Sequence, residues 1–366
     1  MINEDRHVIV TYEPTAWAAV PANNGANGPT WQWGDEILVG FTWGIFSDRR
    51  SGHQCSNDHP FESWLARSTD GGESWDAWQP EPYAGQDPPA AECPCCDHPV
   101  GPFTDPGFVA RIEGNGYHGN RGARWFVSQD KGAAWLGPFG FGGLMEHPAL
   151  QGLEFTGRTA YEVRGARSLD LYLSARIQPG TGALNVVYDK AFLARTTDGG
   201  ATFEFISWLV DEDDPYRAVM PAPVRLSPSD LVVALRRKSA TENWIDCLAS
   251  GDDGATWSFR SRVGKTEDGN QFNGNPPAMV RLADGRLCCA YGNRSRCEIV
   301  ARLSDDEGQT WGPERILRDD FQSVNGWPDL GYCRLFQRTD GRLVVVTFWC
   351  TPDRPQTHIE ATIWTP

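Results

Sequence analysis

Side chains that can transfer protons or bind anions occur in several separate stretches of the chain. His53 and His59 share one polar loop with Asp58. Neutral imidazole titrates near working pH, so either histidine is a candidate general base, with an ordinary loop histidine as the alternative. Asp58 is either a solvated loop carboxylate or an acid/base group. The candidate anion-binding residues, which otherwise pair with turn carboxylates, are Arg158, Arg237, Arg294 and Arg334.

Residues 92–98 form an unusual cysteine-rich segment that contains Cys93, Cys95, Cys96 and His98. Together with His53, Cys55 and His59 it offers ligands for zinc. The segment has no Cys-x₂-Cys pair with matching partner spacing, so disulfides (including one to Cys55) and free thiols stay open alternatives. We therefore expect no metal and no other cofactor.

Composition and charge narrow the partner classes. The chain of 366 residues has a formal net charge of −15, which disfavours nucleic acids and anionic membranes as partners. No apolar run approaches the roughly 18–20 residues of a membrane span. Residues 1–7 have neither a cationic start nor an apolar segment, so no secretory signal is expected and the cytoplasm is slightly favoured. The oligomeric state is left open.

One eight-residue pattern recurs five times: Ser/Thr-x-Asp-x-Gly-x-x, closed by Trp or Phe. The copies are 68–75, 128–135, 196–203, 250–257 and 304–311. The Asp accepts hydrogen bonds from turn amides, the Gly supplies a positive φ, and the aromatic residue enters the core. Each copy follows a strand-like segment, so each predicts a hairpin turn between the third and fourth strands of a repeated unit.

A sixth unit without this pattern follows the fifth copy. It offers strands at 331–337, 342–349 and 358–364, and residues 7–12 supply the missing fourth strand from the other end of the chain. This exchange closes a ring of small sheets and removes open sheet edges. The sequence therefore predicts an all-β, six-bladed β-propeller, with residues 1–366 as a single domain and an N-terminal strand closing the last blade.

The repeats resemble the Asp boxes, or bacterial neuraminidase repeats, of the sialidase family. The segment 331–335, followed by Asp340-Gly341, looks like the family segment with the nucleophilic tyrosine, which implies that Tyr332 is the nucleophile. The resemblance also implies that Asp58 is the acid/base residue. It further places two arginines of the substrate-binding triad, which are Arg236 or Arg237 and Arg294.

Two features depart from the sialidase pattern. The N-terminal Arg-Ile-Pro motif is absent, and Met220-Pro221 stands where a glutamate is expected. Without that glutamate, a phenol with a pKa near ~10 lacks an obvious proton acceptor. Arg158 is the candidate to take over anion binding from the missing arginine.

Ligands of a propeller usually bind at one mouth of the central channel, where the innermost strands open. Asp329 and Trp33 are further substrate-binding candidates there, and Trp17, Trp31, Trp33 and Trp327 suit stacking on sugar rings. We expect a carbohydrate-active enzyme, an exo-glycosidase that removes a terminal acidic sugar from an oligosaccharide or glycoconjugate. Two rivals stay open: a polysaccharide lyase acting on a uronate, with His53, His59 or Tyr332 as the base, and a non-catalytic glycan-binding propeller.

Overall fold

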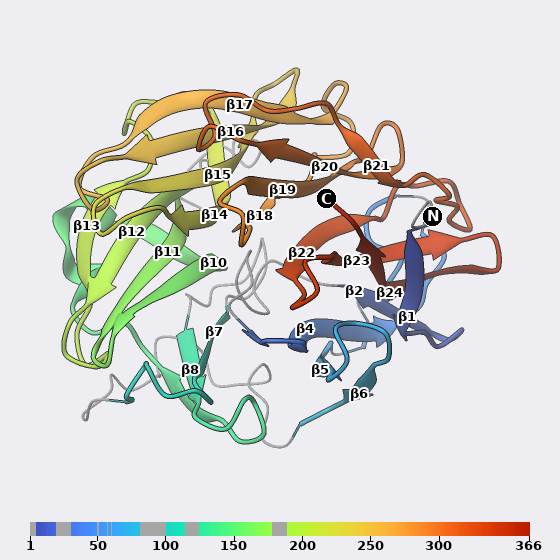
Figure 1. Cartoon of the computed structure of the whole chain (residues 1–366), viewed down its shortest axis with the longest axis horizontal. Helices are drawn as coiled ribbons and strands as arrows, with labels where there is room; N and C mark the ends of the chain where they lie inside the picture. The colour runs from blue at the N-terminus through green and yellow to red at the C-terminus, as the bar shows by residue number, and fades with distance from the viewer. Residues whose placement is uncertain are drawn as a thin grey trace.

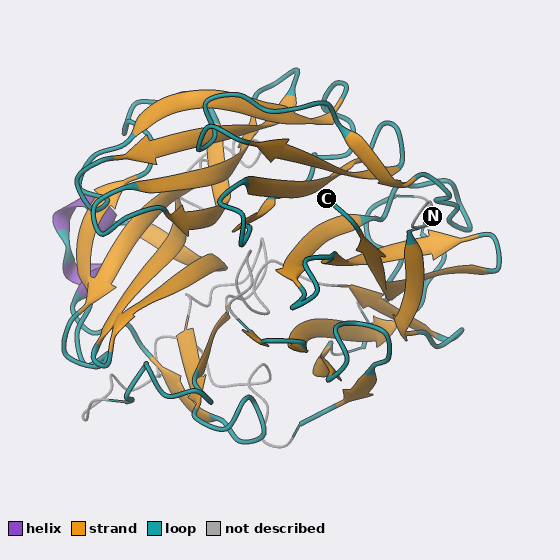
Figure 2. Ribbon diagram, in the orientation of Figure 1, coloured by secondary structure: helices purple, strands orange, loops and turns teal. Residues whose placement is uncertain are grey.

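Six small antiparallel sheets are arranged around a central axis as the blades of a propeller (Figure 1). The computed structural model describes residues 5–19, 31–49, 51–56, 58–59, 61–80, 100–113, 124–177 and 189–366. Strands dominate these residues, and only two short 3-10 turns, Leu144–Glu146 and Pro148–Leu150, are helical (Figure 2). None of the helical segments described is long or apolar enough to cross a membrane.

The blades follow one another in chain order. Blade 1 consists of β2 (Ala16–Ala19), β4 (Glu36–Ile45), β5 (Glu62–Ser68) and β6 (Asp76–Trp78), with β3 (Gln32–Trp33) paired to β4. Blade 2 has, in the described part, β7 (Val109–Glu113), β8 (Arg124–Ser128) and β9 (Leu136–Phe139). Blade 3 consists of β10 (Leu153–Gly165), β11 (Ser168–Ile177), β12 (Lys190–Thr196) and β13 (Glu204–Trp208).

The remaining three blades are built in the same way. Blade 4 consists of β14 (Arg217–Arg225), β15 (Leu231–Lys238), β16 (Asn243–Ser250) and β17 (Ser258–Glu267). Blade 5 consists of β18 (Ala278–Arg281), β19 (Leu287–Asn293), β20 (Glu298–Ser304) and β21 (Arg315–Arg318). Blade 6 consists of β22 (Gly331–Gln337), β23 (Leu343–Thr351), β24 (Arg354–Trp364) and β1 (Arg6–Thr11).

The ring is closed by the two ends of the chain. Strand β1 pairs antiparallel with β24, with Arg6 opposite Ile363 and Thr11 opposite Ile359. Figure 1 shows the two strands side by side near the chain ends. The predicted propeller with an N-terminal strand in its last blade is therefore confirmed.

The five repeated turns share one hydrogen-bond pattern. In the fourth turn, the Ser250 hydroxyl accepts from Gly254 N at 2.9 Å, and Asp252 accepts from Thr256 N at 2.9 Å. Gly254 has φ 85°, and a Cβ there would lie 2.4 Å from Cδ2 of Leu193 in the preceding blade. The turn therefore requires glycine both for its backbone conformation and for its close packing.

These turns also connect neighbouring blades. Trp257 donates from Nε1 to Ser207 Oγ at 3.0 Å, and Ser207 donates to the Gly254 carbonyl at 2.6 Å. Trp311 and Ser261 repeat this arrangement one blade further on. Because Ser207 and Ser261 belong to the outer strands of the preceding blades, the turns fix one blade against the next as well as closing their own hairpins.

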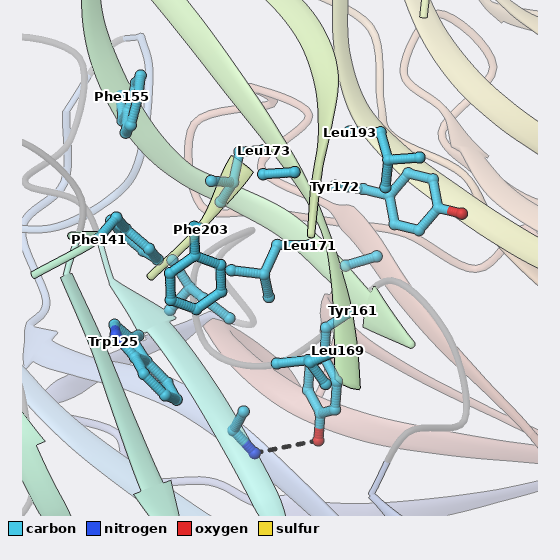
Figure 3. Packing of buried hydrophobic residues seen from close by; sticks show 14 of the residues in the cluster. Trp125, Phe141, Phe155, Tyr161, Leu169, Leu171, Tyr172, Leu173, Leu193 and Phe203 are labelled. Carbon is cyan, nitrogen blue, oxygen red and sulfur yellow. Dashed lines mark hydrogen bonds between the residues drawn. The ribbon is translucent and has the colours of Figure 1, made fainter. Parts of the chain in front are cut away.

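Aromatic side chains fill the space between blades 2 and 3. Trp125 lies edge-on to Phe203, with ring centroids 5.5 Å apart, and Phe141 packs against both Phe203 and Phe155 (Figure 3). The hydroxyl of the buried Tyr161 accepts from Ala110 N at 3.1 Å, the dashed line of Figure 3. This packing holds the blades rigidly enough to position side chains at the hub.

In blade 1, the repeated turn and the loop with His53 lie at different ends. Strand β4 starts beside the first repeated turn, where Gly71 N donates to Asp35 O at 2.8 Å. Its other end, Ile45, lies opposite Ala16 and leads into the loop that contains His53. The repeated turns and the His53 loop therefore lie at opposite ends of blade 1.

Candidate active site

An aspartate–histidine pair joins blade 6 to blade 1 at the end away from the repeated turns. His53 Nδ1 lies 2.7 Å from Oδ1 of Asp329. Asp329 lies just before the innermost strand of blade 6, β22. A carboxylate only accepts hydrogen bonds, so Nδ1 donates to Asp329. Nε2 is then the ring nitrogen that is available for proton transfer. The His53 side chain is 47% exposed, whereas that of Asp329 is 1% exposed. A buried anion thus orients a solvent-accessible imidazole.

Asp329 is held in its charged form by several donors. Its Oδ2 accepts from Trp17 Nε1 at 2.8 Å, Gln54 N at 3.1 Å and Thr357 Oγ1 at 3.2 Å. Burial alone raises the pKa of Asp329, but the charge of His53 and these hydrogen bonds outweigh it and leave the pKa below its usual value. The Trp17 ring also packs edge-on against His53, at 5.3 Å between centroids.

Tyr332 lies in the inner strand β22, three residues after Asp329, and beside the Val219–Met220 segment of blade 4. Tyr332 and Met220 have φ values of 52° and 59°, in the left-handed region that non-glycine residues rarely adopt. Each lies where the pairing of its strand with the next shifts register. Tyr332 packs against the cluster formed by Val219 and Met220, and its ring lies 5.6 Å from Phe348, which is 6.2 Å from His53. The phenol and the imidazole therefore border one phenylalanine ring.

Asn275 fixes the backbone at Tyr332. Its Oδ1 accepts from Tyr332 N at 3.4 Å. A Cβ on Gly331 would lie 2.1 Å from this oxygen, and one on Gly292 would lie 2.8 Å from the amide nitrogen. Two glycines therefore make room for the amide that holds Tyr332.

Two arginines approach the same region through residues 268–275, which we call the 268–275 loop. Arg236 donates to Met220 Sδ at 3.3 Å and to the carbonyl of Asn273. Arg294 donates to the carbonyls of Phe272 at 2.6 Å and Leu330 at 3.5 Å. Both residues are buried, so blade 4 places one cation against Met220 and blade 5 places another against the carbonyl of Leu330, two residues before Tyr332.

Glu267 gives the 268–275 loop its shape. This fully buried residue ends β17 and accepts from Phe272 N at 2.7 Å and from Gly274 N at 2.9 Å. Its negative charge lies beside a loop whose carbonyls receive two guanidinium groups. The loop thus holds Arg236 and Arg294 in place through its backbone.

The structure separates Arg237 from this group. Arg237 pairs with Asp214 at 2.6 Å and with Asp246 at 3.3 Å, on the opposite face of β15 from Arg236. Successive residues of a strand point to opposite faces, so only one of the two arginines can approach Met220. Of the two positions suggested by the sialidase resemblance, the structure places Arg236 there. No sequence signal indicated which face was the inner one.

The other predicted binding residues are spread out. Trp33 lies at the end with the repeated turns, with Lys131 Nζ 5.0 Å from its ring, so it is remote from the His53–Asp329 pair. Arg334 is buried on β22 and donates to the carbonyl of Cys333 at 3.1 Å. Burial lowers the pKa of Arg334 to about 10. Arg158 lies in β10, but its side chain is outside the described part.

The predicted acid Asp58 and the candidate base His59 are both exposed, and Asp58 N donates to Ser56 Oγ at 3.2 Å. Their roles stay predictions. Cys55 is a buried free thiol, and burial raises its pKa to about 11. Among the residues that the structure describes, no group of three or more His, Cys, Asp or Glu side chains is arranged to hold a metal. The segment with Cys93, Cys95, Cys96 and His98 lies outside the described residues, so zinc, free thiols and disulfides within the segment stay open, whereas Cys55 forms no disulfide with it.

The sequence prediction treated Asp329 as a substrate ligand and did not pair it with His53. The structure buries its carboxylate under four donors, so Asp329 positions His53 instead. Trp17, Gln54 and Thr357 were missed as its partners. Only the Asp329–Arg334 run at a predicted inner-strand start pointed to this place in the sequence.

Comparisons with known proteins agree with this architecture. A model of the BNR repeat-like domain matches residues 108–345. A protein of unknown function from Dyadobacter fermentans has a similar structure, with TM-score 0.68 and 20% identity over 99% of both chains. The Hadza microbial sialidase Hz136 has TM-score 0.56 and 15% identity, over 95% of this chain and 66% of that one.

An α-L-arabinanase from Penicillium chrysogenum, solved with arabinobiose, has TM-score 0.56 and 13% identity over 98% of this chain and 97% of its own. No curated protein sequence matches. At these identities the solved structures show a shared fold. The family model covers more than half of the chain, and the chain therefore belongs to the BNR repeat-like domain family of sialidase-like propellers.

Proposed function

We propose that this protein is a glycoside hydrolase that removes a terminal acidic sugar from a glycan. The observation that carries the proposal is the buried Asp329 that orients the exposed His53 near Tyr332. The similar fold of a sialidase and of an arabinanase bound to arabinobiose supports a carbohydrate substrate. Arg236 and Arg294 bring positive charge to the hub of a chain whose net charge is −15, which favours an anionic sugar.

In the proposed reaction, protonated His53 donates its Nε2 proton to the glycosidic oxygen as the bond to the anomeric carbon breaks. In one branch water attacks that carbon, supplies the new hydroxyl group and gives its released proton back to His53. In the other, Tyr332 attacks first and its phenol proton passes to the now neutral His53. His53 then returns that proton to the phenol oxygen as water displaces the sugar, and the proton released by the water restores protonated His53. Asp329 stabilises the charged imidazole throughout, and Asp58 stays an alternative donor of the first proton.

A digest of a glycan library, read by mass spectrometry, tests this proposal. Hydrolysis gives products whose summed mass exceeds the substrate by one water. Tyr332→Phe should lower turnover about 100-fold if the phenol reacts, in line with the usual size of acid, base and nucleophile effects. His53→Ala and Asp58→Asn distinguish the two candidate acids. Binding of glycans without any conversion would contradict the proposal and favour a lectin-like role.

Elimination is a second candidate, favoured by the residue beside Tyr332. Met220 is that neighbour, and its thioether cannot take the phenol proton as a carboxylate would. In a lyase, His53 removes the C5 proton of a uronate, a 4,5 double bond forms, and the C4–O bond breaks with Tyr332 protonating the leaving oxygen. Products of unchanged total mass with new ultraviolet absorbance would identify this reaction.

A further inference from the structure

Two aromatic side chains form a pair between the loops that precede blades 5 and 6. Trp327 lies edge-on to Phe272 of the 268–275 loop, with ring centroids 5.2 Å apart and an interplanar angle of 83°. Both residues are half-buried. Neither is among the residues that pack into the hydrophobic clusters of the described chain, so neither ring is explained by the core.

The backbone holds Trp327 firmly although it lies outside any strand. Its N–H donates to Asn325 Oδ1 at 2.9 Å, and its carbonyl accepts from Ser323 Oγ at 2.9 Å. The same carbonyl accepts from Asp329 N at 2.8 Å. A rigid aromatic surface costs little conformational entropy when it binds a ligand.

The pair is attached to the proposed active site on two sides. The turn that fixes Trp327 also delivers Asp329, the partner of His53. On the other side, the Phe272 carbonyl accepts from Arg294 at 2.6 Å. The segments that carry the two rings therefore border the proposed active site.

The two rings offer apolar surface of the kind that sugars bind. Both are half-buried, and they lie against each other in two loops. Sugar rings present C–H groups, whose positive edge suits the negative face of an aromatic ring.

We propose that Trp327 and Phe272 form a binding subsite for a second sugar residue, next to the sugar that reacts. This inference rests on the proposed function and adds to it the side chains that hold the sugar on the leaving side of the bond that breaks. Trp327 is in this view a specificity-determining residue, and it takes no part in the chemistry.

The test compares monosaccharides with longer partners that contain the same sugar. The probe pairs are N-acetylneuraminate and 3′-sialyllactose, galacturonate and digalacturonate, and arabinose and arabinobiose. We expect the longer member of one pair to bind the wild-type protein about 10-fold more tightly than the monosaccharide, as one aromatic contact allows. Trp327→Ala should abolish most of that advantage and leave monosaccharide binding unchanged, measured by titration calorimetry.

Two further variants serve as controls. Trp327→Phe keeps an aromatic ring and should retain most of the advantage. Phe259→Ala removes an aromatic side chain that is 64% exposed on the outer strand β17 and should change nothing. If Trp327→Ala folds and binds the longer glycan as wild type does, the subsite is refuted while the proposed function survives. If the wild type binds no probe and cleaves no glycan, both proposals fail together.

Discussion

Replacing Asp329 by asparagine tests the role of the His53–Asp329 pair most directly. The asparagine oxygen can still accept from Trp17, Gln54 and Thr357, which leaves its NH₂ group facing His53. His53 Nδ1 must then accept a hydrogen bond, so the ring proton moves to Nε2. A neutral imidazole of that tautomer is a poor acid toward a glycosidic oxygen and cannot act as a base. Hydrolysis and elimination are both impaired.

The size of the effect follows from the geometry. Two unit charges about 4 Å apart interact by about 4 kcal/mol at an effective dielectric constant near 20. His53 is 47% exposed, so water weakens this interaction. A loss of about 2–3 kcal/mol corresponds to about a 30- to 150-fold lower turnover number, close to the lower end of the usual range for general acid–base catalysis.

Turnover and thermal unfolding should be measured together on the substrate that the glycan digest identifies. Asp329→Asn should unfold close to the wild-type temperature, because the asparagine oxygen still accepts hydrogen bonds from Trp17, Gln54 and Thr357. Asp329→Ala should unfold at a clearly lower temperature, since it leaves the buried donors of Trp17 and Gln54 unpaired at about 1–3 kcal/mol each. Retention of more than a third of wild-type turnover by Asp329→Asn would refute the assigned role.

Three further predictions concern the frame and the thiols. Gly254→Ala should lower the free energy of unfolding by about 1–3 kcal/mol in denaturant titrations, because its φ is 85° and the new Cβ would meet Leu193; an unchanged midpoint would contradict this. The hydroxyl and amide of the following threonine lower the pKa of Asp252 and of Asp306 to about 2, below the unfolded value near ~3.9. Their stabilising contribution is therefore complete above about pH 4 and is lost as the pH falls through about 2. Between these pH values, the melting temperature of the double variant Asp252→Asn/Asp306→Asn should depend less on pH than that of the wild type. Cys55, with a pKa of about 11, should resist iodoacetamide in the native protein at pH 8, as peptide mapping would show, and rapid labelling would indicate an opened loop.

Short-range patterns were sufficient to predict the frame. The predicted strand 331–337 coincides with β22, and the predicted N-terminal strand differs from β1 by one residue at each end. The Ser/Thr and Asp hydrogen bonds that shape each repeated turn lie within eight residues, so the turn can be recognised from its own sequence. Ring closure followed from counting strands, since an unpaired edge strand needs a partner.

The site was harder to predict because its contacts are long-range. His53 and Asp329 are 276 positions apart, and no periodicity indicates that they meet. Arg236 and Arg237 are equivalent in the sequence, and only the register of β15 separates them. Trp33 was assigned to the binding mouth because its strand was taken as an innermost one, whereas β3 pairs with β4 near the repeated turns.

Closure of the ring by β1 and β24 has a consequence for when the site can exist. Blade 6 combines β1 with β22, β23 and β24, and Asp329 lies just before β22. During synthesis, β1 therefore has no sheet partner until β24 has left the ribosome, after the strands of blades 1 to 5. A chain cut before Asp329 would leave β1 unpaired and His53 without its carboxylate.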